Sequence, residues 1–204
     1  MTRIIADISV SLEGFVTGPD PAPDNGLGTG GEALHTWAFS DDPDDRRLLR
    51  EATARSGAVV LGRRLFDVVD GPGGWDDRTG YGAGEVGKPA FFVVTSTPPE
   101  SVRLTDLDWT FVTTGLPDAV TAARAHAEEA SSRSGTDLDA VLMGGGTLLG
   151  SALDAGLVDV LQLHLAPVVL GSGTPLFTGG TPRTLVQRAV TATSTATHLT
   201  YDVR

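Results

Sequence analysis

A strand that ends in three glycines is the feature that most constrains this chain. An apolar run at 140–143 predicts a buried strand, and Gly144, Gly145 and Gly146 follow it before a helical pattern starts at Thr147. The start of a helix exposes backbone N–H groups at its positive end, which suits a phosphate group. Glycine also lets a ligand approach the backbone where a Cβ would collide. The sequence therefore predicts an α/β protein that binds a nucleotide at this turn.

Composition limits the class of function. The chain has 204 residues with no internal linker, which predicts one domain spanning 1–204. A formal charge of -11 disfavours binding to nucleic acid or to anionic membranes. The absence of cysteine excludes disulfides and thiol catalysis, and it favours a cytoplasmic location. No metal site is expected, because the histidines are scattered along the sequence at His35, His126, His164 and His198.

Strands and helices alternate through the middle of the chain, and strands alone close it. Strands are predicted at 3–10, 58–61, 90–95, 109–114, 140–143 and 158–170, with a terminal hairpin at 185–192 and 196–203. Helices are predicted at 33–39, 43–55, 63–69, 117–133 and 147–155. The expected fold is a three-layer αβα arrangement with a mixed, mostly parallel central sheet and a C-terminal antiparallel hairpin. Two glycine-rich loops, 14–31 and 70–88, are expected to form walls of a site.

Two further strand ends carry groups that suit a phosphate. Arg63 and Arg64 open a predicted helix, where positive charge opposes the helix dipole, so helix stability does not explain them. They could bind a phosphate by bidentate contacts, or they could form solvated ion pairs with nearby aspartates. Thr95 and Ser96 end another buried strand, where hydroxyls either line a nucleotide site or cap the next turn.

Five blocks occur in a characteristic order: SVSLEGFV (9–16), VLGRRLF (60–66), VVTS (93–96), MGGGTL (143–148) and LHLAPVVLGSGTPLF (163–177). Together they resemble the dihydrofolate reductase-like superfamily. More closely, they resemble the reductase domain of the riboflavin-pathway deaminase–reductase and its stand-alone relatives. The resemblance covers nearly the whole chain.

This resemblance implies NADPH as the cofactor, a small-molecule substrate and a homodimer. The arginines would face the 2′-phosphate and the glycine turn would hold the pyrophosphate. The implied cofactor contacts are Gly62, Arg63, Arg64, Thr95, Ser96, Gly144, Gly145, Gly146, Thr147 and Leu148. The expected substrate contacts, from the first block and from the tryptophans of the loops, are Ser11, Val16, Trp37 and Trp75.

The implied activity is transfer of a hydride from NADPH to a small carbonyl, imine or pterin/pyrimidine-like substrate. Glu13 is the candidate proton donor, which requires its side chain to point into the pocket with a pKa raised by burial. Otherwise Glu13 is a solvated turn residue. Two alternatives for the whole protein are a non-catalytic nucleotide or small-ligand binder of the same fold, and a reductase that uses a flavin or deazaflavin.

Overall fold

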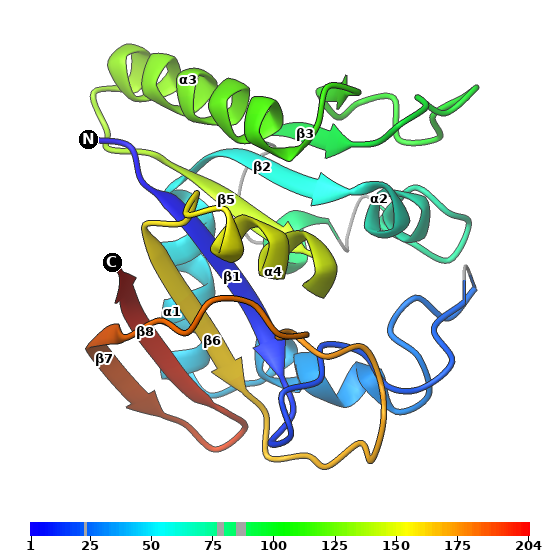
Figure 1. The fold of residues 1–204 in the computed structure, drawn as a ribbon, viewed down its shortest axis with the longest axis vertical. Helices are drawn as coiled ribbons and strands as arrows, with labels where there is room; N and C mark the ends of the chain where they lie inside the picture. The colour runs from blue at the N-terminus through cyan, green and yellow to red at the C-terminus, as the bar shows by residue number, and fades with distance from the viewer. Residues whose placement is uncertain (23, 77–79, 85–88) are drawn as a thin grey trace.

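An eight-stranded sheet forms the centre of the computed structural model, which describes residues 1–22, 24–76, 80–84 and 89–204 (Figure 1). The strand order is β4-β3-β2-β5-β1-β6-β8-β7. The strands from β4 to β6 are parallel, whereas β8 runs antiparallel to both β6 and β7. The strands are β1 (Ile4–Val10), β2 (Ser56–Gly62), β3 (Ala90–Val94), β4 (Trp109–Val112), β5 (Asp139–Gly144), β6 (Val160–Leu165), β7 (Leu185–Ala192) and β8 (Thr197–Val203).

Helices cover both faces of this sheet, which confirms the predicted α/β fold. In Figure 1, α4 lies in front of the sheet and α1 lies behind it. The helices are α1 (Pro43–Ala54), α2 (Arg63–Val69), α3 (Leu116–Ser134) and α4 (Gly146–Asp154), with 3₁₀ turns η1 (Gly31–Phe39) and η2 (Tyr81–Gly84). None of the helices in the described ranges is long and apolar enough to cross a membrane.

The central strand β1 presents a different kind of side chain to each face. Ile4, Ala6 and Ile8 belong to the larger apolar cluster, together with buried residues of α3 and α4. On the other face, Asp7 and Ser9 are hydrogen-bonded to groups from β6 and η1. Because successive side chains of a strand alternate between faces, this pattern puts polar groups on one face of a buried strand.

Two predicted elements differ from the structure. The strand predicted at 158–170 ends at Leu165, since the next residues turn back toward the loop after β1 and Pro167 has no N–H for a ladder hydrogen bond. The helix predicted at 33–39 is a 3₁₀ turn that begins at Gly31. The terminal hairpin is present as predicted, as β7 and β8. Parts of the loop predicted at 70–88, namely 77–79 and 85–88, lie outside the described residues.

Candidate functional site

A cavity of about 800 Å³ opens at the carboxyl ends of the central strands. Its wall includes the glycine turn after β5, the start of α2 and the inner side of η1. Open α/β sheets commonly bind ligands at the carboxyl ends of their strands. Most of the lining is apolar, and polar groups gather in two places: around Arg63 and Arg64 beside β2, and around Asp7 and His35 beside β1.

The glycine turn leaves the start of α4 bare. Gly145 is the N-cap residue, and no side chain in the described part of the chain caps this helix end. A Cβ added at Gly145 would meet no protein atom within 4 Å, whereas one at Gly146 would lie 2.6 Å from a methyl group of Val16. Gly144 has a φ of 131°, which only glycine adopts readily, and the peptide bond that joins it to Gly145 is cis. The open space in front of Gly145 fits a phosphate group that approaches the backbone.

The predicted cofactor residues of this turn and of the start of α2 are distributed as follows. Those that line the cavity are Gly62, Arg63, Arg64, Gly145, Gly146, Thr147 and Leu148. Gly144 does not line the cavity, and a Cβ added to it would lie 3.5 Å from Leu65 and 3.7 Å from Ile8.

Arg63 is placed between two cavities. Its Nη1 donates to the carbonyl oxygen of Thr97 at 2.5 Å, and its Nε donates to an Asp67 carboxylate oxygen at 2.7 Å. The predicted ion pair with an aspartate is therefore present. A second cavity, of about 480 Å³, is lined by Arg63 together with Thr95 and Ser96. The structure thus brings these three predicted residues together next to the main cavity, which Arg63 also lines.

Three of the four predicted substrate contacts line the main cavity, namely Val16, Trp37 and Trp75. The fourth, Ser11, is fully buried and does not line it. Its Oγ accepts hydrogen bonds from the backbone N–H groups of Glu13 and Phe15, at 3.3 and 3.1 Å. Ser11 therefore holds the turn after β1, and its assignment as a substrate contact is wrong.

Glu13 does not meet the condition for a proton donor. Its side chain is exposed outside the cavity, and its carboxylate accepts hydrogen bonds from the N–H groups of Leu170 and Gly171, at 3.0 and 2.8 Å. These contacts, that from Gly171 foremost, lower the pKa of Glu13 instead of raising it. The assignment of Glu13 as the acid is therefore wrong, since the carboxylate ties the loop after β1 to the loop after β6.

A polar cluster beside β1 was not predicted from the sequence. The indole N–H of Trp37 donates to Ser9 Oγ at 2.9 Å, and the Trp37 ring lies 4.0 Å from the ring of His164, centre to centre. Nε2 of His164 lies 3.0 Å from Asp7 Oδ1. The alternation of Asp7 and Ser9 along an otherwise apolar strand is the sequence signal that could have indicated this cluster.

Burial sets the charge state of the neighbouring side chains. It lowers the pKa of His35 to about 4, helped by the nearby His164, so His35 is neutral near pH 7. Burial also raises the pKa of Tyr81, whose hydroxyl lies 2.8 Å from Ser56 Oγ. On this side of the cavity Asp7 therefore lies near two groups, His35 and Tyr81, that are neutral near pH 7.

The family described as the RibD C-terminal domain matches residues 2–200. The chain belongs to the RibD C-terminal domain family. This confirms the resemblance to riboflavin-pathway reductase domains over nearly the whole length.

Solved structures share the fold of this RibD C-terminal domain protein. A protein from Shewanella sp. PV-4 assigned to riboflavin biosynthesis is 20% identical, with a TM-score of 0.65 and coverage of 100% of this chain and 99% of that one. A pyrimidine reductase-like protein from Corynebacterium diphtheriae is 16% identical, with a TM-score of 0.56 and coverage of 100% and 92%. No curated protein matches the chain.

A bifunctional enzyme from Thermotoga maritima is also similar. It is a diaminohydroxyphosphoribosylaminopyrimidine deaminase and 5-amino-6-(5-phosphoribosylamino)uracil reductase, 15% identical with a TM-score of 0.60. The match covers 100% of this chain and 57% of that enzyme.

Proposed function

We propose that this protein is an NADPH-dependent reductase of a pyrimidine-like or other small carbonyl or imine substrate, acting in the cytoplasm. One observation carries the proposal: a single cavity connects a bare glycine turn and two arginines with a polar cluster around Asp7. When bound, NADPH supplies a hydride. The family membership and the fold of the neighbours support a reductase.

The described residues fit the phosphates of NADPH. The uncapped start of α4 offers backbone N–H groups to a pyrophosphate, and the space at Gly145 admits it. Arg63, with Thr95 and Ser96, offers charge-assisted and hydroxyl hydrogen bonds to a 2′-phosphate in the second cavity. Trp37 and Trp75 provide aromatic walls for the main cavity.

The first substrate to test is 5-amino-6-(5-phosphoribosylamino)uracil, which the name of the Thermotoga enzyme gives as its substrate. A uracil ring carries both N–H donors and carbonyl acceptors. Asp7 accepts from N–H groups, and the hydroxyl of Ser9 either donates or accepts, so the polar cluster suits such a ring. Loss of NADPH absorbance in the presence of this compound tests the activity. Cofactor binding without turnover of this compound or of a panel of carbonyls and imines would favour the non-catalytic alternative.

Cofactor preference tests the phosphate contacts. Each charge-assisted hydrogen bond to a phosphate contributes about 1.5–3 kcal/mol, so two of them predict a preference for NADPH over NADH of about a hundredfold. Calorimetric titration should show this preference in the native protein. The double variant Arg63→Ala/Arg64→Ala should lose it, whereas Arg133→Ala on the exposed side of α3 should keep it. Equal affinities of the native protein for the two cofactors would contradict the assignment.

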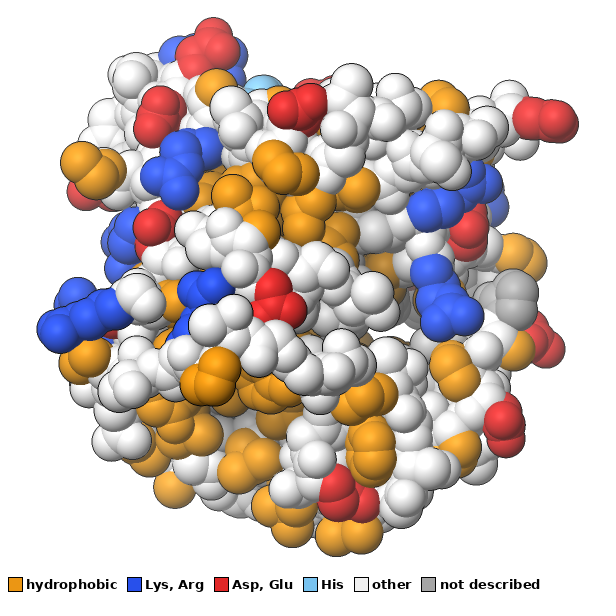
Figure 2. Space-filling view, viewed as in Figure 1, with side chains coloured by type: hydrophobic (Ala, Val, Ile, Leu, Met, Phe, Trp, Pro, Cys, Tyr) orange, Lys and Arg blue, Asp and Glu red, His pale blue; other side chains and the backbone are white. Residues whose placement is uncertain are grey.

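We also propose that the protein forms a homodimer, as the family resemblance implies. Leu12 and Val169 are 59% and 71% exposed, and the N–H of Leu12 bonds to the Val168 carbonyl, so both lie in one loop cluster. Figure 2 shows apolar side chains gathered on the lower part of the molecule, where the loops after β1 and β6 run in the same view in Figure 1. Light scattering should give twice the chain mass of 21.1 kDa. A mass of one chain at micromolar concentration would refute the dimer.

A further inference from the structure

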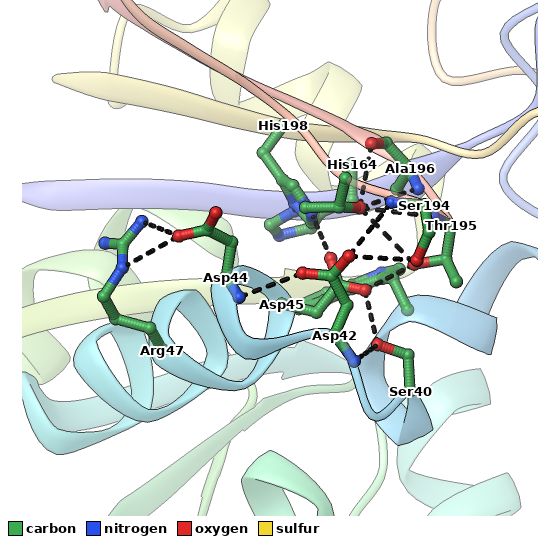
Figure 3. A network of polar contacts seen from close by, with 12 residues as sticks. Ser40, Asp42, Asp44, Asp45, Arg47, His164, Ser194, Thr195, Ala196 and His198 are labelled. Atoms are coloured by element: carbon green, nitrogen blue, oxygen red, sulfur yellow. Dashed lines mark hydrogen bonds and ion pairs between the residues drawn. The ribbon is translucent and has the colours of Figure 1, made fainter.

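Four ionisable side chains form a continuous chain from the cavity to the back of the sheet. Asp7 on β1 contacts His164 on β6, with 3.0 Å between Oδ1 and Nε2. The Nδ1 atoms of His164 and His198 are 2.7 Å apart across the β6–β8 pair. Nε2 of His198 lies 2.8 Å from Asp45 Oδ1 on α1. Figure 3 shows His164, His198 and Asp45 meeting between the strands and α1.

The geometry fixes how many protons these groups hold. Each hydrogen bond needs one proton between its two heavy atoms, and the four groups make three such contacts in series. Two neutral imidazoles supply only two protons, because a neutral imidazole has one N–H and one bare nitrogen. With both Nε2 atoms protonated toward the carboxylates, the Nδ1 atoms of His164 and His198 would face each other as two lone pairs. A separation of 2.7 Å therefore requires a third proton.

The two ends of this chain have different surroundings. At the inner end Asp7 lines the cavity, and its side chain is 24% exposed. At the outer end Asp45 is fully buried, and its second carboxylate oxygen accepts hydrogen bonds from the hydroxyls of Ser40 and Thr195. Both hydroxyl residues are half-buried, so they connect Asp45 with the surface.

We infer that Asp7, His164, His198 and Asp45 form one proton-holding unit with three protons and a net charge of -1, and that Asp7 passes a proton from it to the substrate. This inference rests on the proposed function for the identity of the reaction. The unit spans β1, β6, β8 and α1, and none of the site residues predicted from the sequence belongs to it.

The proposed step balances as follows. Addition of hydride to the carbon of a C=O or C=N group moves the π electron pair to the oxygen or nitrogen. Nε2 of His164 gives its proton to Asp7, and the Asp7 carboxyl passes that proton to the oxygen or nitrogen, which leaves Asp7 as a carboxylate. The unit then holds two protons, one between the two Nδ1 atoms and one on Nε2 of His198. One proton from solvent, entering through the cavity that Asp7 lines, restores the third.

The groups around the unit place the third proton toward the cavity. Burial, together with the charge of His164, lowers the pKa of His198, although Asp45 opposes this. Burial alone would raise the pKa of Asp45, but the hydroxyls of Ser40 and Thr195 outweigh it, so this carboxyl stays ionised. Among the residues that the structure describes, the other titratable groups that face Asp7 are His35 from η1 and Tyr81 from η2, and both are neutral near pH 7.

Nitrogen-15 NMR of the histidine-labelled full chain, before any cofactor is added, tests the proton count. At pH 7 the rings of His164 and His198 should show three N–H protons, with one of them between the two Nδ1 atoms. Two N–H protons on these rings would overturn the inference. Because this measurement needs neither NADPH nor substrate, its failure is distinct from failure of the proposed function.

Asp7→Asn tests whether Asp7 belongs to the unit. Asparagine keeps an oxygen acceptor for His164 but removes the negative charge, so the third proton should be lost at a pH at least one unit lower than in the native protein. Asp106→Asn, at an exposed loop position, should change nothing. An unchanged titration in Asp7→Asn would remove Asp7 from the unit.

The same variant tests proton donation. With NADPH and 5-amino-6-(5-phosphoribosylamino)uracil, Asp7→Asn should slow single-turnover reduction about 10²–10⁴-fold, the usual contribution of general acid catalysis. Its affinity for NADPH should be unchanged, and Asp106→Asn should react at the native rate. Reduction by Asp7→Asn at the native rate would overturn the role of Asp7.

Discussion

Single carboxylates in this protein have roles that depend on the backbone around them. Asp7 and Glu13 are six residues apart along the start of the chain, yet of these two carboxyl groups only that of Asp7 lines the cavity. Replacing Glu13 by Gln should leave the rate of NADPH oxidation unchanged. It should speed amide hydrogen exchange at Leu170 and Gly171, because their N–H groups lose a charged acceptor. Exchange measured by NMR checks this, and a large loss of turnover would return Glu13 to the chemistry.

The lowered pKa of His35 predicts how the stability of the fold depends on pH. Its pKa falls from 6.5 to about 4 in the folded protein, so between these values the unfolded chain binds a proton that the native state does not. Stability is therefore lost as the pH falls from about 6.5 toward 4, by up to about 3 kcal/mol from this residue. Urea unfolding at pH 7 and pH 4.5 should show a smaller loss in His35→Asn than in the native protein. His126→Gln, on α3, should behave like the native protein; equal losses in all three would contradict the prediction.

In the turn between β5 and α4, one glycine is expected to affect ligand binding and the next to affect packing. A Cβ at Gly145 would enter open space, so Gly145→Ala should weaken NADPH binding with little effect on unfolding. A Cβ at Gly146 would meet a Val16 methyl at 2.6 Å, so Gly146→Ala should destabilise the fold by about 1–3 kcal/mol. Adding Val16→Ala to Gly146→Ala should recover part of that loss. Thermal unfolding and calorimetry together check this contrast, which fails if both glycines respond alike.

At the scale of elements, the sequence predicted regular segments better than it predicted their ends. Helix 63–69 matches α2, and the hairpin strands match β7 and β8 closely, because local pattern decides them. The strand predicted at 158–170 is too long, since the apolar residues after Leu165 pack in a loop that is bound to the segment after β1. Hydrogen-bond partners that lie far away in the sequence determine where that strand ends. The periodicity of a short segment contains no information about such partners.

For the whole molecule, the sequence predicted the α/β fold and the family correctly. It indicated only some of the residues that line the cavity. The glycine turn and Arg63, which line the cavity, could be picked out as candidates because each is unusual within its own segment. The chain of Asp7, His164, His198 and Asp45 was missed because its members are 34 or more residues apart in sequence, with no local pattern among the histidines. They meet only because β1, β6 and β8 become neighbours in the sheet.

The position of β1 in the sheet has a consequence for the synthesis of the protein. β1 is made before its sheet partners β5 and β6, which begin at Asp139 and Val160. β8, which carries His198, follows later still, at Thr197–Val203. β1 must therefore wait without sheet neighbours while more than a hundred further residues are made. The polar side of the cavity beside β1 is completed only once β8 has left the ribosome, so a nascent chain that lacks β8 cannot yet bind a ligand there.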